Sequence, residues 1–198
     1  TIITAQLSDM MWRDTYKVSS IERYPLAWDK RDIDTAVDSW YVHDFGIPWK
    51  HHDWDLTLHP AGHIPGAAML HIKTPTTTVL LTGDFDTRDS PLVSGAQPVQ
   101  TDILFVEGTY GGRDHPPKEE EIDRFIQAVA EVVRRGGTVL IPAFANGRTQ
   151  DVVMLLHRHL PNLNVHVDGM GKSVAKTHME HGSLLRDNNA LERAWRWA

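Results

Sequence analysis

Cysteine is absent from the 198 residues, and so is any long apolar run. Without cysteine the chain can form neither disulfides nor thiolate metal sites, so a metal ion would need imidazole and carboxylate ligands. The twelve histidines could supply the imidazoles. No apolar run approaches the ~18 to 20 residues that span a bilayer, and the first residues do not resemble a signal peptide. We therefore expect a soluble, cytoplasmic protein with no membrane partner.

An excess of positive charge is also lacking, since the formal net charge is −6. Proteins that bind nucleic acids usually carry a basic surface, so this charge argues weakly against such a partner. The charges are unevenly distributed, however. Residues 1–111 hold 8 Lys and Arg against 15 Asp and Glu, whereas residues 112–198 hold 12 against 11. A basic groove in the second part of the chain is therefore still compatible with the composition.

The first part of the chain is rich in strand signals. After a helix that starts near Thr4 as its cap, and a second helix near residues 32–41, short apolar runs predict strands at residues 55–59, 67–73, 77–83 and 102–107. Pro75 lies between the second and third of these runs and predicts a hairpin turn.

From about residue 113 the pattern changes to longer helices that alternate with strands. Apolar residues at helical spacing predict helices at 118–135, 147–159 and 171–181, and apolar runs predict buried strands at 138–144 and 164–169. The segment "YGGRDHPPKEE", rich in Gly, Pro and charge, is the expected domain boundary. We expect one domain over residues 1–112 and a second, of βαβ type, over residues 113–198.

Three polar residues stand where such folds place their sites. Asp84 and Glu107 each follow an apolar strand, and His63 lies in the glycine-flanked turn "HPAGHIPGAAM". Catalytic groups often sit at the C-terminal ends of strands. A single Asp after a strand is nevertheless more often a turn residue or a helix cap, so each residue taken alone is weak evidence.

Four fragments in order carry more information than any one residue. The series "AGHIPGAAM", "LLTGDF", "VEGTYGGRDH" and "IPAFANGRTQ" resembles the β-CASP nucleases of the metallo-β-lactamase superfamily, particularly the branch with the 3′-end-processing endonuclease of cleavage-and-polyadenylation factor and its archaeal relatives. The resemblance implies an α/β fold: part of a metallo-β-lactamase αββα sandwich over residues 1–112, followed by part of an inserted β-CASP domain over residues 113–198.

The resemblance also implies roles for the three polar residues. His63 would be a zinc ligand, Asp84 would bridge two zinc ions, and Glu107 would orient a histidine that acts as general acid. The implied reaction is hydrolysis of RNA phosphodiester bonds, in which zinc lowers the pKa of a bound water and stabilises the developing charge. The small neighbours of His63 suit this role because they leave room beside the imidazole.

The fragment "PAFANGRTQ" is expected to lead into a helix, with Arg148 and Gln150 beside its N-terminus. Free backbone amides at that position suit a phosphate, so both residues could contact RNA. Two alternatives remain open: Arg148 could simply pair with Asp151, and Gln150 could simply cap the helix.

The family's His-x-His-x-Asp-His loop is missing from this sequence. The fragments "HHDWD" (51–55) and "HRH" (157–159) lack its spacing, and we expect their histidines to be solvated. The chain therefore resembles a segment that is truncated at both ends, with two ligands, too few for a closed zinc site. We expect the isolated segment to bind metal weakly and to be inactive, within a parent that is a zinc-dependent ribonuclease.

Two other functions compete with this interpretation. One is a non-catalytic β-CASP paralogue that acts as an RNA-binding or scaffold subunit of a processing complex. The other keeps the superfamily but changes the substrate to DNA or to small esters. Partners beyond RNA would be subunits of a processing complex or a second copy in a homodimer.

Overall fold

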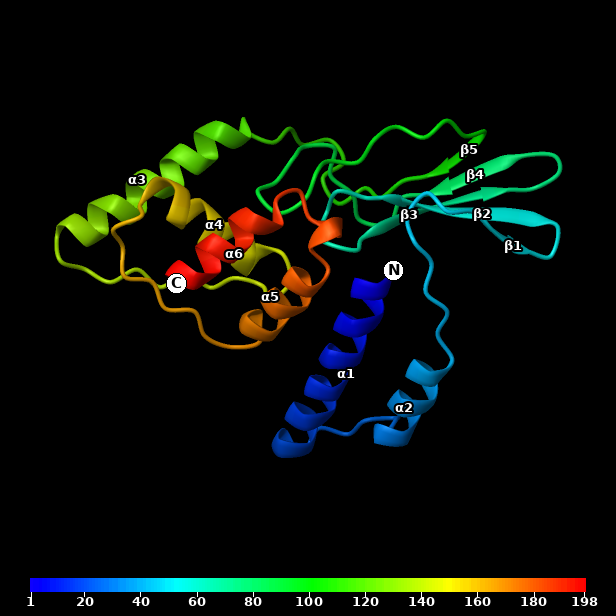
Figure 1. The fold of residues 1–198 in the computed structure, drawn as a ribbon, viewed down its shortest axis with the longest axis horizontal. Helices are drawn as coiled ribbons and strands as arrows, with labels where there is room; N and C mark the ends of the chain where they lie inside the picture. Colours follow the sequence, from blue (N-terminus) through cyan, green and yellow to red (C-terminus); the bar gives the residue numbers. More distant parts are fainter. The chain divides into compact units, whose positions relative to one another are not determined.

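The computed structural model describes residues 1–198 and divides them into two compact units (Figure 1). The first unit contains Thr1–Thr87 and Gly95–Phe105, and the second contains Arg88–Ser94 and Val106–Ala198. The assignment of residues 1–112 and 113–198 to two family domains stays a prediction.

A five-stranded sheet forms the main part of the first unit. Its strands are β1 (Trp49–His51), β2 (Trp54–Pro60), β3 (Ala68–Lys73), β4 (Thr78–Leu81) and β5 (Ile103–Phe105), in the spatial order β1-β2-β3-β4-β5. Neighbouring strands are antiparallel except for β4 and β5, which are parallel. The four predicted strands and the hairpin between β3 and β4 are confirmed, whereas β1 was not predicted.

One face of this sheet carries the core of the first unit. Because side chains alternate along a strand, Met69 of β3 and Leu80 of β4 lie on the same face. Both are buried, and they pack with Ala61 and Ala96 from the segments that follow β2 and precede β5. The core therefore lies beneath the ends of the strands from which His63 and Asp84 emerge.

Two helices complete the first unit. Helix α1 (Ile2–Glu22) begins at Thr1, whose hydroxyl accepts a hydrogen bond from the Thr4 amide. The cap predicted at Thr4 is therefore wrong by three residues, because the helix starts earlier than the apolar pattern indicated. Helix α2 (Lys30–Asp38) follows as predicted, slightly earlier than expected, because Asp29 caps its N-terminus.

The second unit is helical. It contains α3 (Lys118–Arg134), α4 (Arg148–His159), α5 (Gly171–Glu180), a short 3-10 helix, η1 (Gly182–Leu184), and α6 (Asn188–Trp197). The three helices predicted after residue 113 are confirmed. Buried side chains from the segment between β4 and β5 join those of α4 and α6 in one cluster: Leu92, Val93, Val153, Met154, Leu191 and Ala194.

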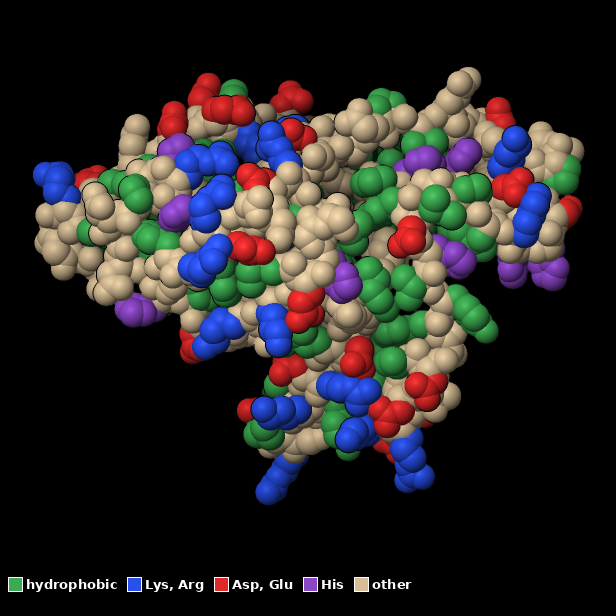
Figure 2. Space-filling view, viewed as in Figure 1, with side chains coloured by type: hydrophobic (Ala, Val, Ile, Leu, Met, Phe, Trp, Pro, Cys, Tyr) green, Lys and Arg blue, Asp and Glu red, His purple; other side chains and the backbone are tan.

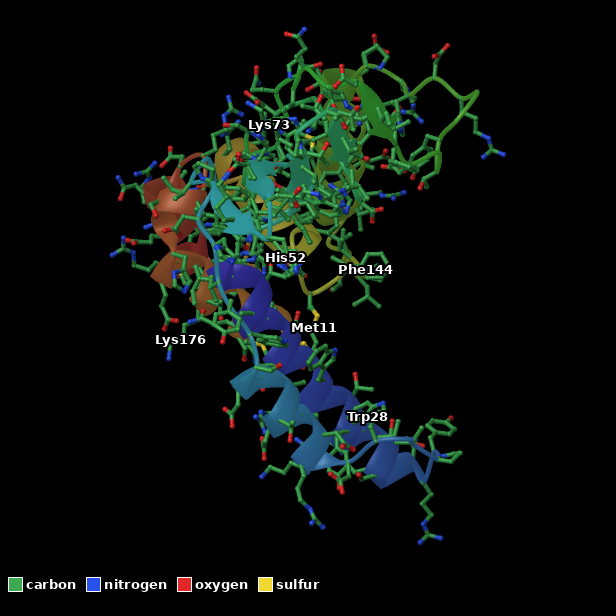
Figure 3. All side chains as sticks on the ribbon, turned by 90° about the vertical axis from the view of Figure 1, so that its right-hand side faces the viewer. Met11, Trp28, His52, Lys73, Phe144 and Lys176 are labelled. Carbon is green, nitrogen blue, oxygen red and sulfur yellow. The ribbon has the colours of Figure 1, made fainter.

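The two strands predicted in the second unit do not form. Residues 138–144 have no regular secondary structure and pair with no strand, and the side chains of Leu140 and Phe144 are 92% and 81% exposed. Figure 3 shows Phe144 projecting away from the ribbon. A strand needs a hydrogen-bonded neighbour, and this unit contains none. Residues 164–169 are likewise unpaired.

The structure thus has the predicted α/β class, with a mixed sheet and helices. None of its helices combines the length and the apolar character that a bilayer crossing requires.

Among the glycines of the first unit, Gly62 leaves the least room for a side chain. Its φ of +70° lies in the left-handed region, and a Cβ atom there would lie 2.3 Å from the Asp86 carbonyl oxygen and 2.4 Å from the Ala96 amide nitrogen. Backbone atoms cannot move aside as a flexible side chain can. Only glycine therefore fits between the turn that carries His63 and the two segments beside it.

We predict that Gly62→Ala destabilises the first unit by about 1 to 3 kcal/mol more than Gly46→Ala. Gly46 has nearly the same φ, +73°, but open space around its Cβ position, so it controls for backbone strain. Urea denaturation followed by tryptophan fluorescence reports this unit, because five of the seven tryptophans precede residue 55. Equal losses in both variants would show that Gly62 is not tightly packed.

Candidate functional site

His63 lies in the turn between β2 and β3. The Ala61 amide donates to the Ala67 carbonyl (2.9 Å) and so closes this turn. The N-terminus of α1 fixes it from outside, because the hydroxyls of Thr1 and Thr4 donate to the Gly66 carbonyl at 3.0 and 3.1 Å. His63 is half-buried. The imidazole is thus carried by a turn that is tied down at several points.

Asp84 lies three residues after the end of β4, close to the strand end that the sequence predicts, and is exposed. The segment in which it lies runs beside the His63 turn. The Asp86 amide donates to the Ala61 carbonyl at 3.0 Å, and Phe85 packs against the core cluster that contains Ala61. The structure therefore brings together the two segments that carry His63 and Asp84, although they are about 20 residues apart in sequence.

The side chains of His63 and Asp84 form no hydrogen bond or ion pair with other residues. Their nitrogen and oxygen atoms are therefore not committed to the fold. No group of three or more His, Asp or Glu side chains in the chain could hold a metal ion, however. His63 and Asp84 alone do not make a complete zinc site, which takes at least three protein ligands.

Glu107 follows β5 and belongs to the second unit, as do Arg148 and Gln150. Its carboxylate is half-buried and accepts a hydrogen bond from the Thr109 amide at 3.1 Å. This bond holds the carboxylate in the loop before α3. The role predicted for Glu107 stays a prediction.

Gln150 is fully buried at the start of α4, and its side chain forms hydrogen bonds with backbone groups there. Its Oε1 accepts from the Gly147 amide (2.9 Å), and its Nε2 donates to the carbonyls of Ala145 and Gly171, both at 3.0 Å. Gln150 therefore caps the helix, which is one of the two alternatives that the sequence left open. Its bond to the Gly171 carbonyl also links α4 to α5. To contact a substrate, Gln150 would have to break these bonds.

Arg148 is the exposed member of the same helix start. Its guanidinium lies 3.7 Å from the carboxylate of Asp151, the pairing that the sequence left open. Asp151 is buried and also accepts a hydrogen bond from the Leu92 amide at 3.1 Å. Burial raises the pKa of the Asp151 carboxyl, and the charge of Arg148 opposes that rise. The contact between Arg148 and Asp151 is too long for a strong hydrogen bond, and the guanidinium is exposed to solvent. The guanidinium can therefore still bind an anion.

Two further polar residues at this helix start were not recognised in the sequence. His178 of α5 is fully buried, and its Nε2 lies 3.1 Å from Oδ1 of Asn146, in the turn before α4. Its Nδ1 is buried without a partner. Burial lowers the pKa of His178 to about 4. Local sequence gives no signal for this pair, because the two residues are 32 positions apart.

We predict that protonation of His178 destabilises the second unit in acid. The unfolded histidine has a pKa near 6.5 and the folded one near 4, so the unfolded state binds the extra proton between these values. Stability is therefore fully present above about pH 6.5 and is lost as the pH falls, by up to about 1.4 kcal/mol per pH unit.

Urea denaturation followed by circular dichroism at pH 7, 6, 5 and 4.5 measures this loss. His178→Gln keeps a side-chain donor for Asn146 but cannot titrate, so its stability should fall less steeply. The raised pKa of Asp151 has the opposite effect, because its protonation makes the folded state more stable as the pH falls. Both the wild-type protein and His178→Gln contain Asp151, so its contribution cancels when their pH slopes are compared. Identical pH slopes for both proteins would refute the prediction.

The histidines of the fragments "HHDWD" and "HRH" do not belong to the candidate site. His51 and His52 are exposed in the turn between β1 and β2, and His159 is exposed at the end of α4. The expectation that they are solvated is confirmed for these three. On the face shown in Figure 2, several Lys and Arg side chains gather near one another, with Asp and Glu side chains beside them.

No family model matches the chain. Curated proteins do match it. The probable RNase MJ4 of Methanocaldococcus jannaschii is 30% identical over 202 residues, which cover 98% of this chain and 47% of that protein. RNase aCSPSF2 of Saccharolobus solfataricus is 28% identical, over 98% of this chain and 40% of that protein.

A eukaryotic relative matches at a similar level. Subunit 3 of the cleavage and polyadenylation specificity factor of Dictyostelium discoideum is 35% identical over 159 residues, which cover 79% of this chain and 20% of that protein. The chain thus spans less than half the length of these relatives. The relatives agree with the family indicated by the four ordered sequence fragments, whose His63 and Asp84 segments pack side by side. The chain belongs to the β-CASP family of the metallo-β-lactamase superfamily.

Proposed function

We propose that the chain is part of a zinc-dependent ribonuclease that hydrolyses RNA phosphodiester bonds in RNA processing or decay in the cytoplasm. One observation carries this proposal. The turn with His63 and the segment with Asp84 are held side by side by the Asp86–Ala61 hydrogen bond, while both functional side chains remain uncommitted. Two relatives named as RNases match 98% of this chain, which supports RNA as the substrate.

In this proposal the first unit contributes metal ligands. An imidazole and a carboxylate are both ligands that zinc accepts, and a bridging carboxylate can hold two ions together. His63 and Asp84 would be two members of the set, and further ligands would have to come from other residues of the protein. The first unit is then one part of an αββα sandwich, and its mixed sheet provides the strand ends from which both ligands emerge.

The second unit would contribute groups that act on the RNA itself. As part of a β-CASP domain, it would place the solvated guanidinium of Arg148 at the start of α4, where helix amides also favour a phosphate. Glu107 would orient a general acid. Gln150 would support this surface from below, through its three bonds to the backbone. A second copy or the subunits of a processing complex are the proposed protein partners.

We predict that Asp84→Asn in the full-length protein abolishes bound zinc and RNA cleavage together. The loss should exceed the roughly 10- to 100-fold effects of residues that only support a ligand. Zinc is measured by elemental analysis of the purified protein, and cleavage with a labelled RNA. Asp53→Asn removes the same charge from an exposed turn of the same unit and should leave both values unchanged.

Each outcome of this experiment has a clear meaning. Retention of zinc and of cleavage by Asp84→Asn would exclude Asp84 from the site and contradict the proposal. A wild-type protein that binds RNA but neither holds zinc nor cuts would contradict it as well, and would favour the non-catalytic paralogue. Cleavage of DNA alone would replace RNA by DNA as substrate.

A further inference from the structure

A cavity of about 260 Å³ lies between α1 and α2, away from the residues discussed so far. We call it the indole pocket. Its lining combines two tryptophans, two aliphatic side chains and one carboxylate: Trp12, Trp28, Ile33, Ala36 and Asp32. Trp28 lies in the loop that joins the two helices, and Figure 3 shows it away from the sheet.

Neighbouring aromatic rings hold both indoles in place. The ring of Trp12 lies 5.2 Å from that of Trp40, centre to centre, with an angle of 59° between the planes. The ring of Trp28 lies 6.2 Å from that of Tyr16. Such tilted pairs are favourable arrangements of aromatic rings. Each indole of the pocket therefore has an aromatic neighbour that supports its position.

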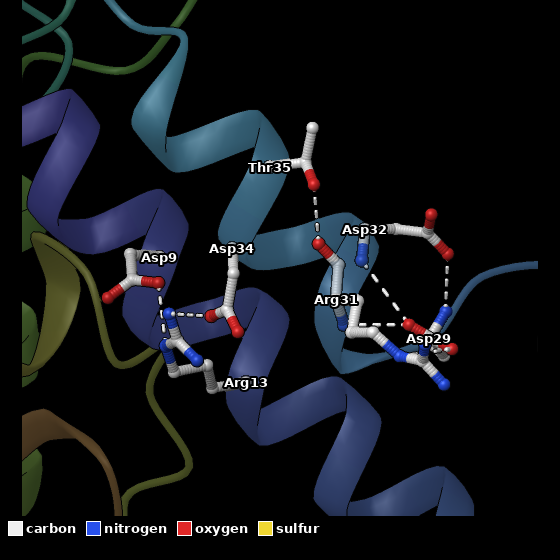
Figure 4. A network of polar contacts seen from close by, with 7 residues as sticks. All are labelled: Asp9, Arg13, Asp29, Arg31, Asp32, Asp34 and Thr35. Atoms are coloured by element: carbon white, nitrogen blue, oxygen red, sulfur yellow. Dashed lines mark hydrogen bonds and ion pairs between the residues drawn. The ribbon is translucent and has the colours of Figure 1, made fainter.

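Asp32 is the only charged residue in the lining, and the start of α2 fixes its position. The Asp29 amide donates to Oδ2 of Asp32 at 2.7 Å (Figure 4). The nearby cation of Arg13 on α1 is engaged elsewhere, since it binds Asp9 at 2.7 Å and Asp34 at 2.8 Å. No basic side chain of this protein lines the pocket, so its single negative charge has no internal counter-ion there.

We propose that the indole pocket binds the side chain of an arginine in a basic segment of a protein partner. A guanidinium stacks on aromatic faces and pairs with a carboxylate, and this pocket offers both. Its volume is below the ~300 Å³ at which pockets for drug-sized ligands begin, and so suits one side chain. This inference does not rest on the proposed ribonuclease function.

The charge of the pocket favours arginine over the other aromatic-binding ligand, an RNA base. The two helices and the loop between them, residues 1–38, hold seven acidic against five basic side chains, and Asp34 is paired with Arg13, so the excess of negative charge around the pocket is small. The carboxylate of Asp32 in the lining nevertheless attracts a basic peptide and repels the phosphates that flank a base. A nucleotide is therefore the alternative that the experiment must exclude.

The test is an NMR titration of the full-length, ¹⁵N-labelled protein, in which the indole N–H signals are followed. The ligands are an acetylated, amidated peptide Gly-Ser-Arg-Ser-Gly, the same peptide with alanine for arginine, and adenosine and uridine monophosphates. We expect the arginine peptide to shift the signals of Trp12 and Trp28 saturably, with an affinity that falls as salt is added. The alanine peptide and the nucleotides should cause no saturable shift.

Variants then assign the binding to the pocket. Asp32→Asn should weaken the arginine peptide by about 2- to 5-fold, as expected for loss of an exposed ion pair, and Trp28→Leu by at least as much. Asp38→Asn removes the same charge from the far end of α2 and should have no effect. Circular dichroism checks that the helices persist, which is expected because asparagine can still accept the Asp29 amide.

Several results would overturn the proposal. These are equal shifts with the arginine and alanine peptides, equal affinities in Asp32→Asn and Asp38→Asn, or saturable binding of a nucleotide alone. If Asp32→Asn loses helical signal, Trp28→Leu decides the question, and unchanged affinity in that variant would refute the site. RNA cleavage is not a readout here, so failure of this proposal leaves the proposed ribonuclease function untouched.

Discussion

The close approach of three backbone segments at Gly62 is the constraint on which the candidate site depends. A side chain at this position would collide with the Asp86 carbonyl oxygen and the Ala96 amide nitrogen. The absence of a Cβ atom lets the turn after β2 lie directly on the segment after β4, and the Asp86–Ala61 hydrogen bond then fixes their register. His63 follows Gly62 in the sequence and Asp84 lies two residues before Asp86, so the packing of the two segments that carry them follows from backbone contacts.

Local signals predicted most of the first unit. The strands are short apolar runs, and the hairpin between β3 and β4 is closed by a turn with Pro75, so both could be recognised within a few residues. The support of the His63 turn could not be predicted. Thr1 and Thr4 reach the Gly66 carbonyl across more than 60 positions, and this contact depends on how the whole unit folds. The same long-range docking explains why α1 begins before its apolar pattern suggests.

In the second unit, the apolar pattern alone was a less reliable guide to secondary structure. Its helices were predictable because their apolar faces repeat at helical spacing, but the apolar run at residues 138–144 was misread as a buried strand. Burial requires something to pack against, and Leu140 is almost fully exposed. Conversely, Leu92 has no distinctive local pattern and yet is buried against α4 and α6. Gln150 and His178 are determined by tertiary contacts in the same way.

The central claim is that His63 and Asp84 coordinate a common metal centre. A crystal structure of the zinc-loaded, full-length protein, with anomalous diffraction at the zinc edge, tests it most directly. The account predicts an anomalous peak with a His63 nitrogen at about 2.0 to 2.1 Å and an Asp84 oxygen at about 2.0 to 2.2 Å. Zinc bound elsewhere, with His63 and Asp84 both uncoordinated or facing separate sites, would contradict it.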